Sequence, residues 1–514
     1  MLVIDYIVIV LSLLLSLYLG SYFSKRQTSA HIFFTTGGRV PAWAVGMSIL
    51  ATLISSVTFI AYPGAGYLGK WILLVQAIMV VIVLSVIVWF VVPLYRKIIK
   101  ISTYEYFERR FGFFARLYSS LAFAFTHFSK MGTVFFLLAL AIANIVNLDP
   151  YLTVWLVGFV VIYVTFKGGM EAIIWLDAIQ GFLLIMGGVL SVVIIFLKAL
   201  GSYSTIFQII EQYDKIDFGP YDLNFAKLTF IVMALNGIFY GIQKYATDQT
   251  IVQRYLTTKT DKEAVKAALT GVYLSLPIWT LFMFIGTLLF AYYKVNQVLP
   301  AGIKAEEVFI YFMKNELPVG IKGLVISALI AAAISSLDSD LNSLSAVAVE
   351  DYYKRFRPNA SEEEKFRVAK LVILIAGIAS LGIATLYVAT GSEGVLGIVF
   401  GLYAIFSGGI AGIFLLGIFS RRANKKGLYV AIVVCILFTA WATLTTTKIN
   451  DKLLIDLGRF NFPHHVYMIG VYTHLIIIVI GYIASLFFKS EKVDEALTIY
   501  PWLKNLRKSK YETA

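Results

Sequence analysis

Long apolar stretches repeat along the chain of 514 residues, and the charged residues gather in the short segments between them. Several stretches exceed the roughly 20 residues that an α-helix needs to cross the hydrocarbon core of a bilayer. Thirteen stretches predict membrane-spanning helices, at about 3–22, 41–67, 72–97, 115–146, 150–166, 172–199, 227–246, 264–293, 317–350, 366–389, 394–418, 427–446 and 464–487. The pattern therefore predicts an all-α polytopic protein of the cell membrane, with about 13 transmembrane helices.

The composition supports this prediction. Hydrophobic residues make up 59% of the chain and charged residues only 14%, whereas soluble globular proteins carry about 25% charged residues. A soluble enzyme and a disordered chain are therefore both excluded. The one cysteine, Cys435, lies within an apolar stretch and has no second cysteine with which to form a disulfide or a thiolate metal site.

The basic residues indicate how the chain is oriented in the membrane. If the N-terminus lies outside, 31 of the 43 Lys and Arg residues fall in inner loops and the tail, 11 fall in outer loops, and Lys130 lies within a span. This is the positive-inside pattern, and it predicts an N-out, C-in topology. The net charge of +13 thus reflects the membrane, and no nucleic-acid partner is expected. The basic tail after Phe488 either contacts anionic membrane lipid or is simply solvated.

A cluster of hydroxyl side chains interrupts the apolar stretch at 41–67 near its middle: Ser48, Thr52, Ser55, Ser56 and Thr58. An unwound turn here would expose backbone carbonyls, which a membrane helix tolerates only where they line a cavity or hold an ion. The alternative is that the hydroxyls join neighbouring helices by hydrogen bonds. These residues alone are compatible with both roles.

A second polar cluster lies in the stretch at 317–350. At 3.6 residues per turn, four small residues share one face of this predicted helix: Ala332, Ser335, Ser336 and Ser339. Asp338 lies about one turn deeper than Ser335. Hydroxyl and carbonyl oxygens without His or Cys suit a hard cation rather than zinc or copper. The cluster therefore predicts a site for a weakly held monovalent ion; the alternative is a purely structural polar contact.

Two ionisable residues within the predicted spans are further candidates, because charge at membrane depth is expensive. Lys130 lies about fifteen residues into its span, too deep to extend its ammonium group to the surface with ease. It needs either an acidic partner, for which Asp177 and Asp338 are the candidates, or an anionic substrate. Asp177 lies near the inner end of its helix, where it either joins an ion site or is favoured by the helix dipole alone.

Four motifs in order along the chain resemble the sodium:solute symporter family, whose members carry sugars, proline, carboxylates, iodide and sialic acid with sodium. The motifs are Trp43-Ala-Val-Gly46 leading into 51–58, Gly168-Gly169 with Trp175-Leu-Asp-Ala-Ile-Gln180, Asp248-Gln-Thr-Ile-Val-Gln-Arg-Tyr255, and Ile334-Ser-Ser-Leu-Asp-Ser339. They extend over roughly residues 40–345, and the hydropathy continues the match to about 487. Each motif alone is weak, but the ordered set is specific.

The resemblance implies a LeuT-like core of two inverted five-helix repeats. It divides the chain into a peripheral first helix with an inner loop, the first repeat, an outer loop, the second repeat, peripheral helices and a cytoplasmic tail. The corresponding ranges are 1–40, 41–199, 200–226, 227–418, 419–487 and 488–514.

The resemblance also implies the ligands of the coupling ion, Na⁺. Carried over to this chain, the first sodium site uses three backbone carbonyls and two hydroxyls, those of Ala51, Ile54, Ala332, Ser335 and Ser336. Some family members have a second, deeper site, which here would use Asp177, Ser335 and Ser339. Asp338 stands where those members have a hydroxyl, so the site would be altered, and the number of sodium ions per solute stays open.

The substrate is a small organic solute, and three segments resemble the sialic-acid branch of the family: 58–63, 130–137 and 243–249. That branch has an Arg where this chain has Lys130, and the two are not interchangeable at a bidentate carboxylate site. Lys130 can still bind an acid as a point charge, with three polar side chains completing the pocket: Ser55, Thr58 and Gln76.

We therefore expect a sodium-coupled symporter that imports an organic anion by alternating access. A neutral sugar or proline is the alternative solute, and proton coupling stays open because Asp177 and Asp338 are titratable. An uncoupled facilitator or a channel is the competing class of function. No constellation of nucleophile, base or metal ligands points to an enzyme. Nothing in the sequence indicates the oligomeric state.

Overall fold

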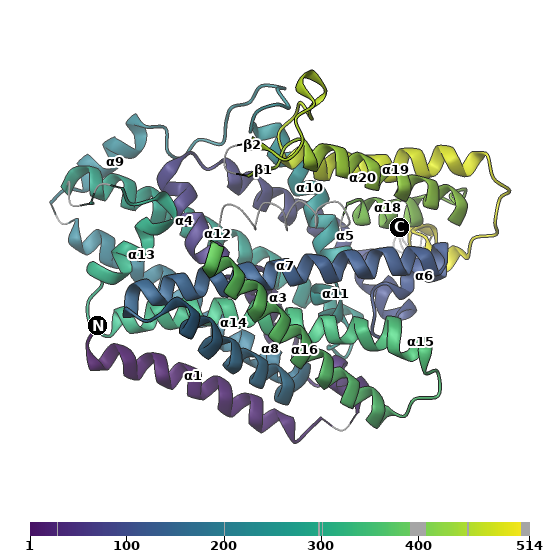
Figure 1. Cartoon of the computed structure of the whole chain (residues 1–514), viewed down its shortest axis with the longest axis horizontal. Coiled ribbons are helices and arrows are strands. Elements are labelled where there is room, and N and C mark those ends of the chain that lie inside the picture. The colour runs from purple at the N-terminus through teal and green to yellow at the C-terminus, as the bar shows by residue number, and fades with distance from the viewer. Residues whose placement is uncertain are drawn as a thin grey trace, which may run out of the picture.

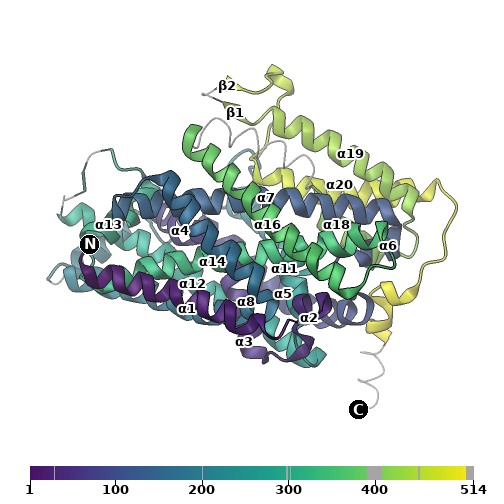
Figure 2. The ribbon, with the colours of Figure 1, turned by 60° about the horizontal axis from the view of Figure 1, so that its bottom comes forward.

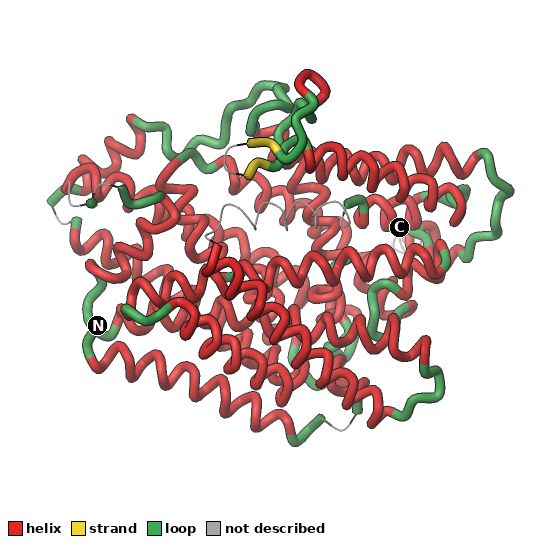
Figure 3. Tube along the Cα trace, in the orientation of Figure 1, coloured by secondary structure: helices red, strands yellow, loops and turns green. Residues whose placement is uncertain are grey.

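The computed structural model describes residues 1–27, 29–199, 201–296, 299–300, 302–390, 408–449 and 452–504, and most of it is helical (Figures 1 and 3). The α-helices are α1 (Val3–Ser24), α2 (Ala30–Thr35), α3 (Ala42–Leu53), α4 (Ser56–Leu68), α5 (Ile72–Ile98), α6 (Glu105–Phe111), α7 (Phe113–Val146), α8 (Pro150–Lys198), α9 (Tyr203–Gln212), α10 (Phe230–Ala246), α11 (Gln249–Tyr255), α12 (Asp261–Asn296), α13 (Ala305–Asn315), α14 (Ile321–Val347), α15 (Lys354–Phe356), α16 (Glu362–Thr390), α18 (Ile410–Phe419), α19 (Lys425–Leu444) and α20 (Tyr467–Leu486). A π-helical turn, Ala348–Tyr353, joins α14 to α15, and short 3-10 turns lie at Thr36–Gly38, Gly458–Phe460 and Glu495–Leu497. Two short strands, β1 (Lys448–Ile449) and β2 (Lys452–Leu453), pair antiparallel.

Within the described residues, nine helices are long and apolar enough to cross a membrane: α1, α5, α7, α8, α12, α14 with its continuation to Phe356, α16, α19 and α20. The pair α3 and α4, bent by 57°, gives a tenth span that is broken in the middle. This number is smaller than the thirteen predicted because α8 contains two predicted spans, while α10 and α18 are short. Most of the predicted span at 394–418 lies outside the described residues.

Gly169 divides the 49-residue helix α8 into two arms. Its φ of +60° belongs to a conformation that residues with a Cβ rarely adopt. A Cβ at this position would also lie 2.6 Å from Cδ2 of Phe33. The junction accounts for the two spans that hydropathy predicts here, at 150–166 and 172–199.

The helices are arranged so that α1 lies along one edge of the molecule and the paired helices α19 and α20 lie along the opposite edge (Figures 1 and 2). Between these edges α14 packs against α8, α1 and α7, while α12 packs against α3, α4 and α5. The N-terminus lies at the same end of the molecule as α13, and α6 lies at the other end in both views.

Two helices are interrupted near the centre of this arrangement. The first interruption lies between α3 and α4, where Ile54 has extended backbone angles of φ −103° and ψ 108°. The second lies between α10 and α11, where Asp248 accepts a hydrogen bond from the Thr250 backbone N–H at 2.8 Å and so begins α11. Each interruption frees backbone carbonyls from helical hydrogen bonds, which is the arrangement that membrane transporters use at binding sites.

The sequence prediction leaves a connection between the predicted spans at 227–246 and 264–293, and the structure shows a buried helix at its centre. Residues 249–255 form α11, and all seven of its side chains are buried. Arg254, which belongs to this helix, is fully buried. The polar composition of this segment resembles that of a loop, but its polar groups are satisfied by other helices rather than by water.

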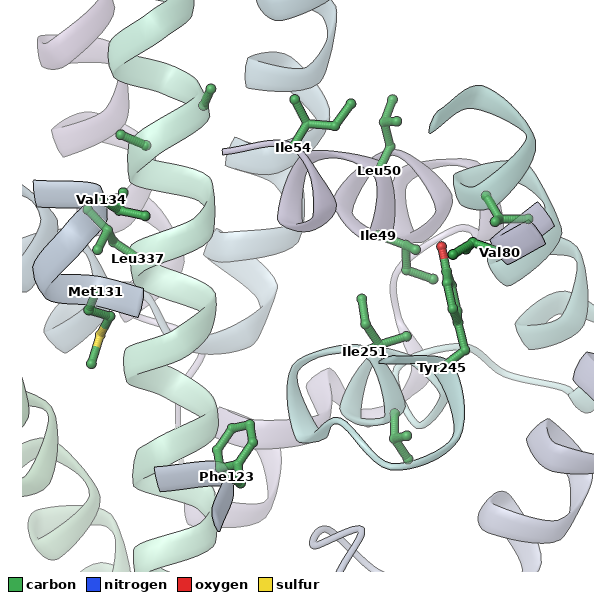
Figure 4. Close-up of a cluster of buried hydrophobic side chains, with 14 of the residues drawn as sticks. Ile49, Leu50, Ile54, Val80, Phe123, Met131, Val134, Tyr245, Ile251 and Leu337 are labelled. Atoms are coloured by element: carbon green, nitrogen blue, oxygen red, sulfur yellow. The ribbon is translucent and has the colours of Figure 1, made fainter. Parts of the chain in front are cut away.

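The apolar core around the interruptions is shown in Figure 4. On one side, Met131 and Val134 of α7 lie beside Leu337 of α14. On the other side, Ile49 of α3 lies near Tyr245, at the end of α10. The core thus holds α7 against α14 and α3 against the α10–α11 break, which positions the polar side chains described next.

Candidate functional site

The interruption between α3 and α4 faces the polar surface of α14. Ser335 Oγ donates to the carbonyl oxygens of Ala51 and Ala332, at 3.1 Å each. Ser336 Oγ donates to the carbonyl oxygen of Thr52 at 3.4 Å. Both serines are fully buried. The structure therefore brings together uncharged oxygens from two helices, which is the chemistry that a hard monovalent cation prefers.

Four of the five residues predicted for the first sodium site take part in this contact: Ala51, Ala332, Ser335 and Ser336. The fifth, Ile54, is buried at the start of the extended turn that ends α3. Thr52 was not predicted as a ligand. Its carbonyl reaches Ser336 because the helix ends one residue later and Thr52 faces α14.

The deeper cluster around Asp177 contains a guanidinium group that the sequence prediction missed. Arg254 Nη2 donates to Asp177 Oδ2 at 2.8 Å and to Ser339 Oγ at 2.6 Å. Arg254 Nε donates to Ser48 Oγ at 2.7 Å, and Ser48 Oγ in turn donates to Asp177 Oδ2 at 2.5 Å. One side chain of α11 thus joins α3, α8 and α14. No hydropathy signal identifies Arg254, although it belongs to one of the four motifs.

Asp338 lies beside this cluster without a cationic partner of its own among the described residues. It is fully buried, and the hydroxyl of Ser339 donates to its Oδ1 at 3.5 Å. Asp338 Oδ2 and Asp177 Oδ1 are buried and have no hydrogen-bond partner among the described residues. Two carboxylates and one guanidinium leave one negative charge uncompensated, and a buried uncompensated charge is costly. The donor set therefore fits one further monovalent cation.

Asp177 lies eight residues beyond the kink in α8, so the dipole of that arm of the helix does not explain why an aspartate stands at this position.

A cavity of about 340 Å³ lies next to the interruption between α3 and α4. All four residues predicted to bind the substrate line this cavity: Ser55, Thr58, Gln76 and Lys130. Aromatic rings form another part of its wall, with the ring centroids of Tyr62 and Trp279 6.5 Å apart in a stacked arrangement. The cavity thus combines an apolar wall with a few polar groups and one ammonium group, as small-molecule sites do.

Lys130 pairs with Asp340, so the prediction that Asp177 or Asp338 is its partner is wrong. Its Nζ lies 3.0 Å from Asp340 Oδ2, while 28% of the lysine side chain stays exposed in the cavity wall. Asp340 follows Asp338 by two residues, and two residues turn an α-helix by about 200°. Asp340 therefore faces α7, whereas Asp338 faces the cluster around Arg254.

Four ionisable residues near the cavity were missed by the sequence prediction: His127, Lys244 and Asp248, which line it, and Asp340, which pairs with Lys130. His127 Nδ1 lies 2.8 Å from Asp340 Oδ1, and its Nε2 lies 3.3 Å from Asp248 Oδ2. Lys244 Nζ donates to Asp248 Oδ2 at 2.6 Å. The three-residue spacing of His127 and Lys130 on one helix was a signal for this cluster, but their partners come from distant segments.

The chain resembles a known family of membrane transporters over most of its length. A model of the sodium:solute symporter family matches residues 33–435. The sodium/sialic acid symporter SiaT of Proteus mirabilis is 37% identical over 440 residues, which cover 84% of this chain and 88% of that protein. The sodium/sialic acid symporter NanT of Aliivibrio fischeri is 32% identical over 483 residues, which cover 93% of this chain and 92% of that protein.

The fold of this chain is similar to the folds of solved transporter structures. The substrate-bound, outward-open structure of a Na⁺-coupled sialic acid symporter superposes with a TM-score of 0.87 at 35% identity, and the match covers 96% of this chain and 99% of that one. Mhp1, a transporter of the nucleobase-cation-symport-1 family, superposes with a TM-score of 0.57 at 17% identity and shares the fold alone.

Proposed function

The chain belongs to the sodium:solute symporter family, and from this premise we propose that it imports a sialic acid together with sodium by alternating access. It is a multi-pass membrane transporter of a small solute, not an enzyme, and its coupling ion is Na⁺. The observation that carries the choice of solute is the ammonium group of Lys130, which lies partly exposed in the wall of a polar cavity.

The cavity has the groups that a sugar acid needs. Lys130 offers a positive charge for a carboxylate, and Ser55, Thr58 and Gln76 offer hydrogen-bonding groups for sugar hydroxyls. The rings of Tyr62 and Trp279 offer an apolar face for the ring of the sugar. A neutral sugar has no carboxylate for Lys130, and proline has a carboxylate but no hydroxyls for Ser55, Thr58 and Gln76, so these solutes use fewer of the polar groups of the cavity.

The proposed first sodium site lies where α3 unwinds against α14. Its ligands are the carbonyls of Ala51, Ile54 and Ala332 and the hydroxyls of Ser335 and Ser336. The hydrogen bonds that already join Ser335 to two of these carbonyls support the proposal, because the oxygens are close enough to share one ion. A bound Na⁺ would hold the two halves of the core together next to the solute cavity.

We propose a second sodium at Asp177, Asp338 and Ser339. The two carboxylate oxygens that lack a hydrogen-bond partner among the described residues support this site. With Arg254 paired to Asp177, one monovalent cation makes the cluster neutral.

Energetics favour two sodium ions for an anionic solute. One Na⁺ with one monovalent anion moves no net charge, so only the sodium gradient drives uptake, and a tenfold gradient supplies about 1.4 kcal/mol. A second Na⁺ adds about 1.4 kcal/mol and makes transport electrogenic, which gains about 2.3 kcal/mol at 100 mV. The sum of about 5 kcal/mol supports accumulation of roughly 4,000-fold, because each 1.4 kcal/mol corresponds to a factor of ten.

The membrane potential provides a test of the second site. We expect an inside-negative potential to stimulate uptake by the wild type, and the Asp338→Asn variant to lose this stimulation while it keeps its need for sodium. Equal uptake by the wild type with and without the potential would exclude two sodium ions per anion.

The proposed architecture has thirteen transmembrane helices in an N-out, C-in topology, with inverted repeats at 41–199 and 227–418. The first helix of each repeat is interrupted, as α3–α4 and as α10–α11, which supports the division. The peripheral helices are then α1, α19 and α20, which lie at the edges of the molecule (Figures 1 and 2). The basic segments at α6 and α15 lie at the end opposite to the N-terminus, which supports the orientation.

The substrate proposal is tested by uptake into proteoliposomes of labelled sialic acid, neutral sugars, proline and monocarboxylates, with and without a sodium gradient. We expect sialic acid alone to accumulate strongly, and only with sodium outside. Uptake of a neutral sugar in preference to sialic acid would contradict the proposal, and accumulation indifferent to sodium would indicate an uncoupled facilitator.

A further inference from the structure

Five ionisable side chains form one connected network beside the cavity: Lys130, His127, Asp340, Asp248 and Lys244. They come from three parts of the fold, namely α7, α14 and the break between α10 and α11. Each carboxylate of the network contacts His127 and one lysine, which is Lys130 for Asp340 and Lys244 for Asp248. Within this network, His127 is therefore the link between α14 and the α10–α11 break.

His127 bridges the two carboxylates of the network. Both ring nitrogens lie within hydrogen-bond distance of a carboxylate oxygen, Nδ1 at 2.8 Å from Asp340 and Nε2 at 3.3 Å from Asp248. The shorter of the two contacts is the one to Asp340. The ring is 1% exposed and packs on Phe123 with centroids 4.1 Å apart, so water does not replace either carboxylate.

Lys130 is the more accessible of the two lysines in the network. Its side chain is 28% exposed, whereas that of Lys244 is 11% exposed, and both residues line the cavity. A solute carboxylate in the cavity can therefore reach Lys130, and this inference rests on the function proposed above.

We infer that His127 is a positioning residue that retains Asp340 when Lys130 turns to the solute. In the present arrangement Lys130 is bound to Asp340, at 3.1 Å from Oδ1 and 3.0 Å from Oδ2. To bind a solute carboxylate, the ammonium group has to leave Asp340, and a buried carboxylate that loses its only cation is strongly destabilised. The ring of His127, with its Nδ1 2.8 Å from Asp340 Oδ1, remains beside this carboxylate, so the exchange does not leave Asp340 without a partner.

The same contact couples solute binding to the moving parts of the core. His127 joins Asp340 on α14 to Asp248, the residue that begins α11. When a solute carboxylate takes the place of Asp340 as the partner of Lys130, the hydrogen bond between Asp340 and His127 becomes stronger. Because His127 also contacts Asp248, this change stabilises the position of α11. His127 thus acts on the solute through Lys130 and Asp340, without a contact of its own to the solute carboxylate.

A charge-rescue experiment tests this role. Equilibrium binding of sialic acid and of its neutral methyl ester is measured in saturating sodium for the wild type, His127→Gln, Asp340→Asn and the double variant. We expect His127→Gln to raise the Kd for the acid by about tenfold, a change of about 1.4 kcal/mol, because Lys130 is then held by an otherwise unpaired Asp340. Asp340→Asn frees Lys130 and should not raise the Kd. The double variant removes the competitor and should bind the acid within about threefold of the wild type.

Another buried histidine, His474 on α20, provides the control. His474→Gln should change neither the Kd for the acid nor the Kd for the methyl ester. The methyl ester should bind the wild type and His127→Gln equally. If His127→Gln weakens binding of the acid and Asp340→Asn does not restore it, the role of His127 is merely structural and the inference is overturned. A raised Kd in Asp340→Asn alone would also overturn it. That second test does not depend on whether His127→Gln folds. A wild type that binds the acid and the ester equally, or does not bind the acid, would contradict the proposed function and this inference with it.

Discussion

Arg254 Nη2 lies 2.8 Å from Asp177 Oδ2, and both side chains are fully buried. The pair joins α11, the short half of an interrupted helix, to the second arm of α8. Gln253 strengthens the same junction, because its Nε2 donates to the carbonyl oxygen of Phe34 at 2.9 Å and to Asn342 Oδ1 at 3.0 Å. In this conformation α11 is therefore held against α8 and α14. A conformational change that moves α11 away from these helices has to break the ion pair between Arg254 and Asp177.

The first prediction concerns this ion pair. Arg254→Met should lower the free energy of unfolding by about 3–5 kcal/mol, because it leaves the buried carboxylate of Asp177 without its cationic partner. Asp177→Asn should cost less, because Asp338 remains as a carboxylate beside Arg254. The double variant removes both charges of the pair and should be more stable than Arg254→Met. The measurement is a double-mutant cycle from thermal or denaturant unfolding in detergent. Arg109→Met, which breaks an exposed pair with Glu105, is the control and should cost less than about 1 kcal/mol.

The second prediction concerns the first sodium site. Ser335→Ala and Ser336→Ala should each raise the sodium concentration for half-maximal uptake by about tenfold, because each removes an oxygen that suits a monovalent cation. Expression should not change. Ser327→Ala is the matched control, since Ser327 lies on the same helix and its hydroxyl donates to the carbonyl of Gly323 in the preceding turn. Normal sodium activation in both test variants would refute the site.

The third prediction concerns recognition of the solute acid. Lys130→Ala should abolish uptake of sialic acid, whereas Lys130→Arg should retain it, because a guanidinium also binds a carboxylate. Uptake assays and binding of the acid measure the effect. Lys70→Ala removes an exposed lysine that pairs with Asp217, away from the cavity, and should leave uptake intact. Undiminished affinity in Lys130→Ala would show that the lysine serves only its ion pair with Asp340.

The fourth prediction concerns the loop after α9. Lys215 Nζ donates to the carbonyl oxygen of Tyr67 at 2.7 Å, and burial lowers the pKa of this lysine to about 8. An unfolded chain holds the proton up to a pH near 10.4, so it binds more protons than the folded chain above about pH 8. Stability should therefore rise between about pH 8 and pH 10. The melting temperature should rise in this range for the wild type and less for Lys215→Met; equal slopes would contradict the assignment.

Hydropathy predicted the long helices well, because each carries apolar side chains over most of its length, whether these are buried among other helices or exposed, as most are in α1. The predicted spans at 3–22, 72–97 and 115–146 correspond closely to α1, α5 and α7. Hydropathy did not reveal the short helix α11, because the burial of its polar side chains depends on partners far away in the sequence, as the pair of Arg254 with Asp177 shows. A local pattern does not contain such information.

The candidate site, like the fold, could be predicted from the sequence only in part. The oxygen cluster at Ser335 and Ser336 was predictable, because small polar residues on one face of a membrane helix are unusual. The partner of Lys130 was not, because Asp177, Asp338 and Asp340 are equally acidic and only the packing of α7 on α14 selects Asp340. Figure 4 shows that packing at Met131, Val134 and Leu337.

The most direct measurement is the influx of radioactive sodium into proteoliposomes with and without saturating sialic acid, alongside the influx of the labelled acid itself. Coupled transport predicts that the acid accelerates sodium entry in a constant proportion, two ions for each acid molecule, and that Ser336→Ala needs about tenfold more sodium for the same acceleration. Sodium entry that ignores the acid, or acid entry that persists when potassium replaces sodium, would contradict the account.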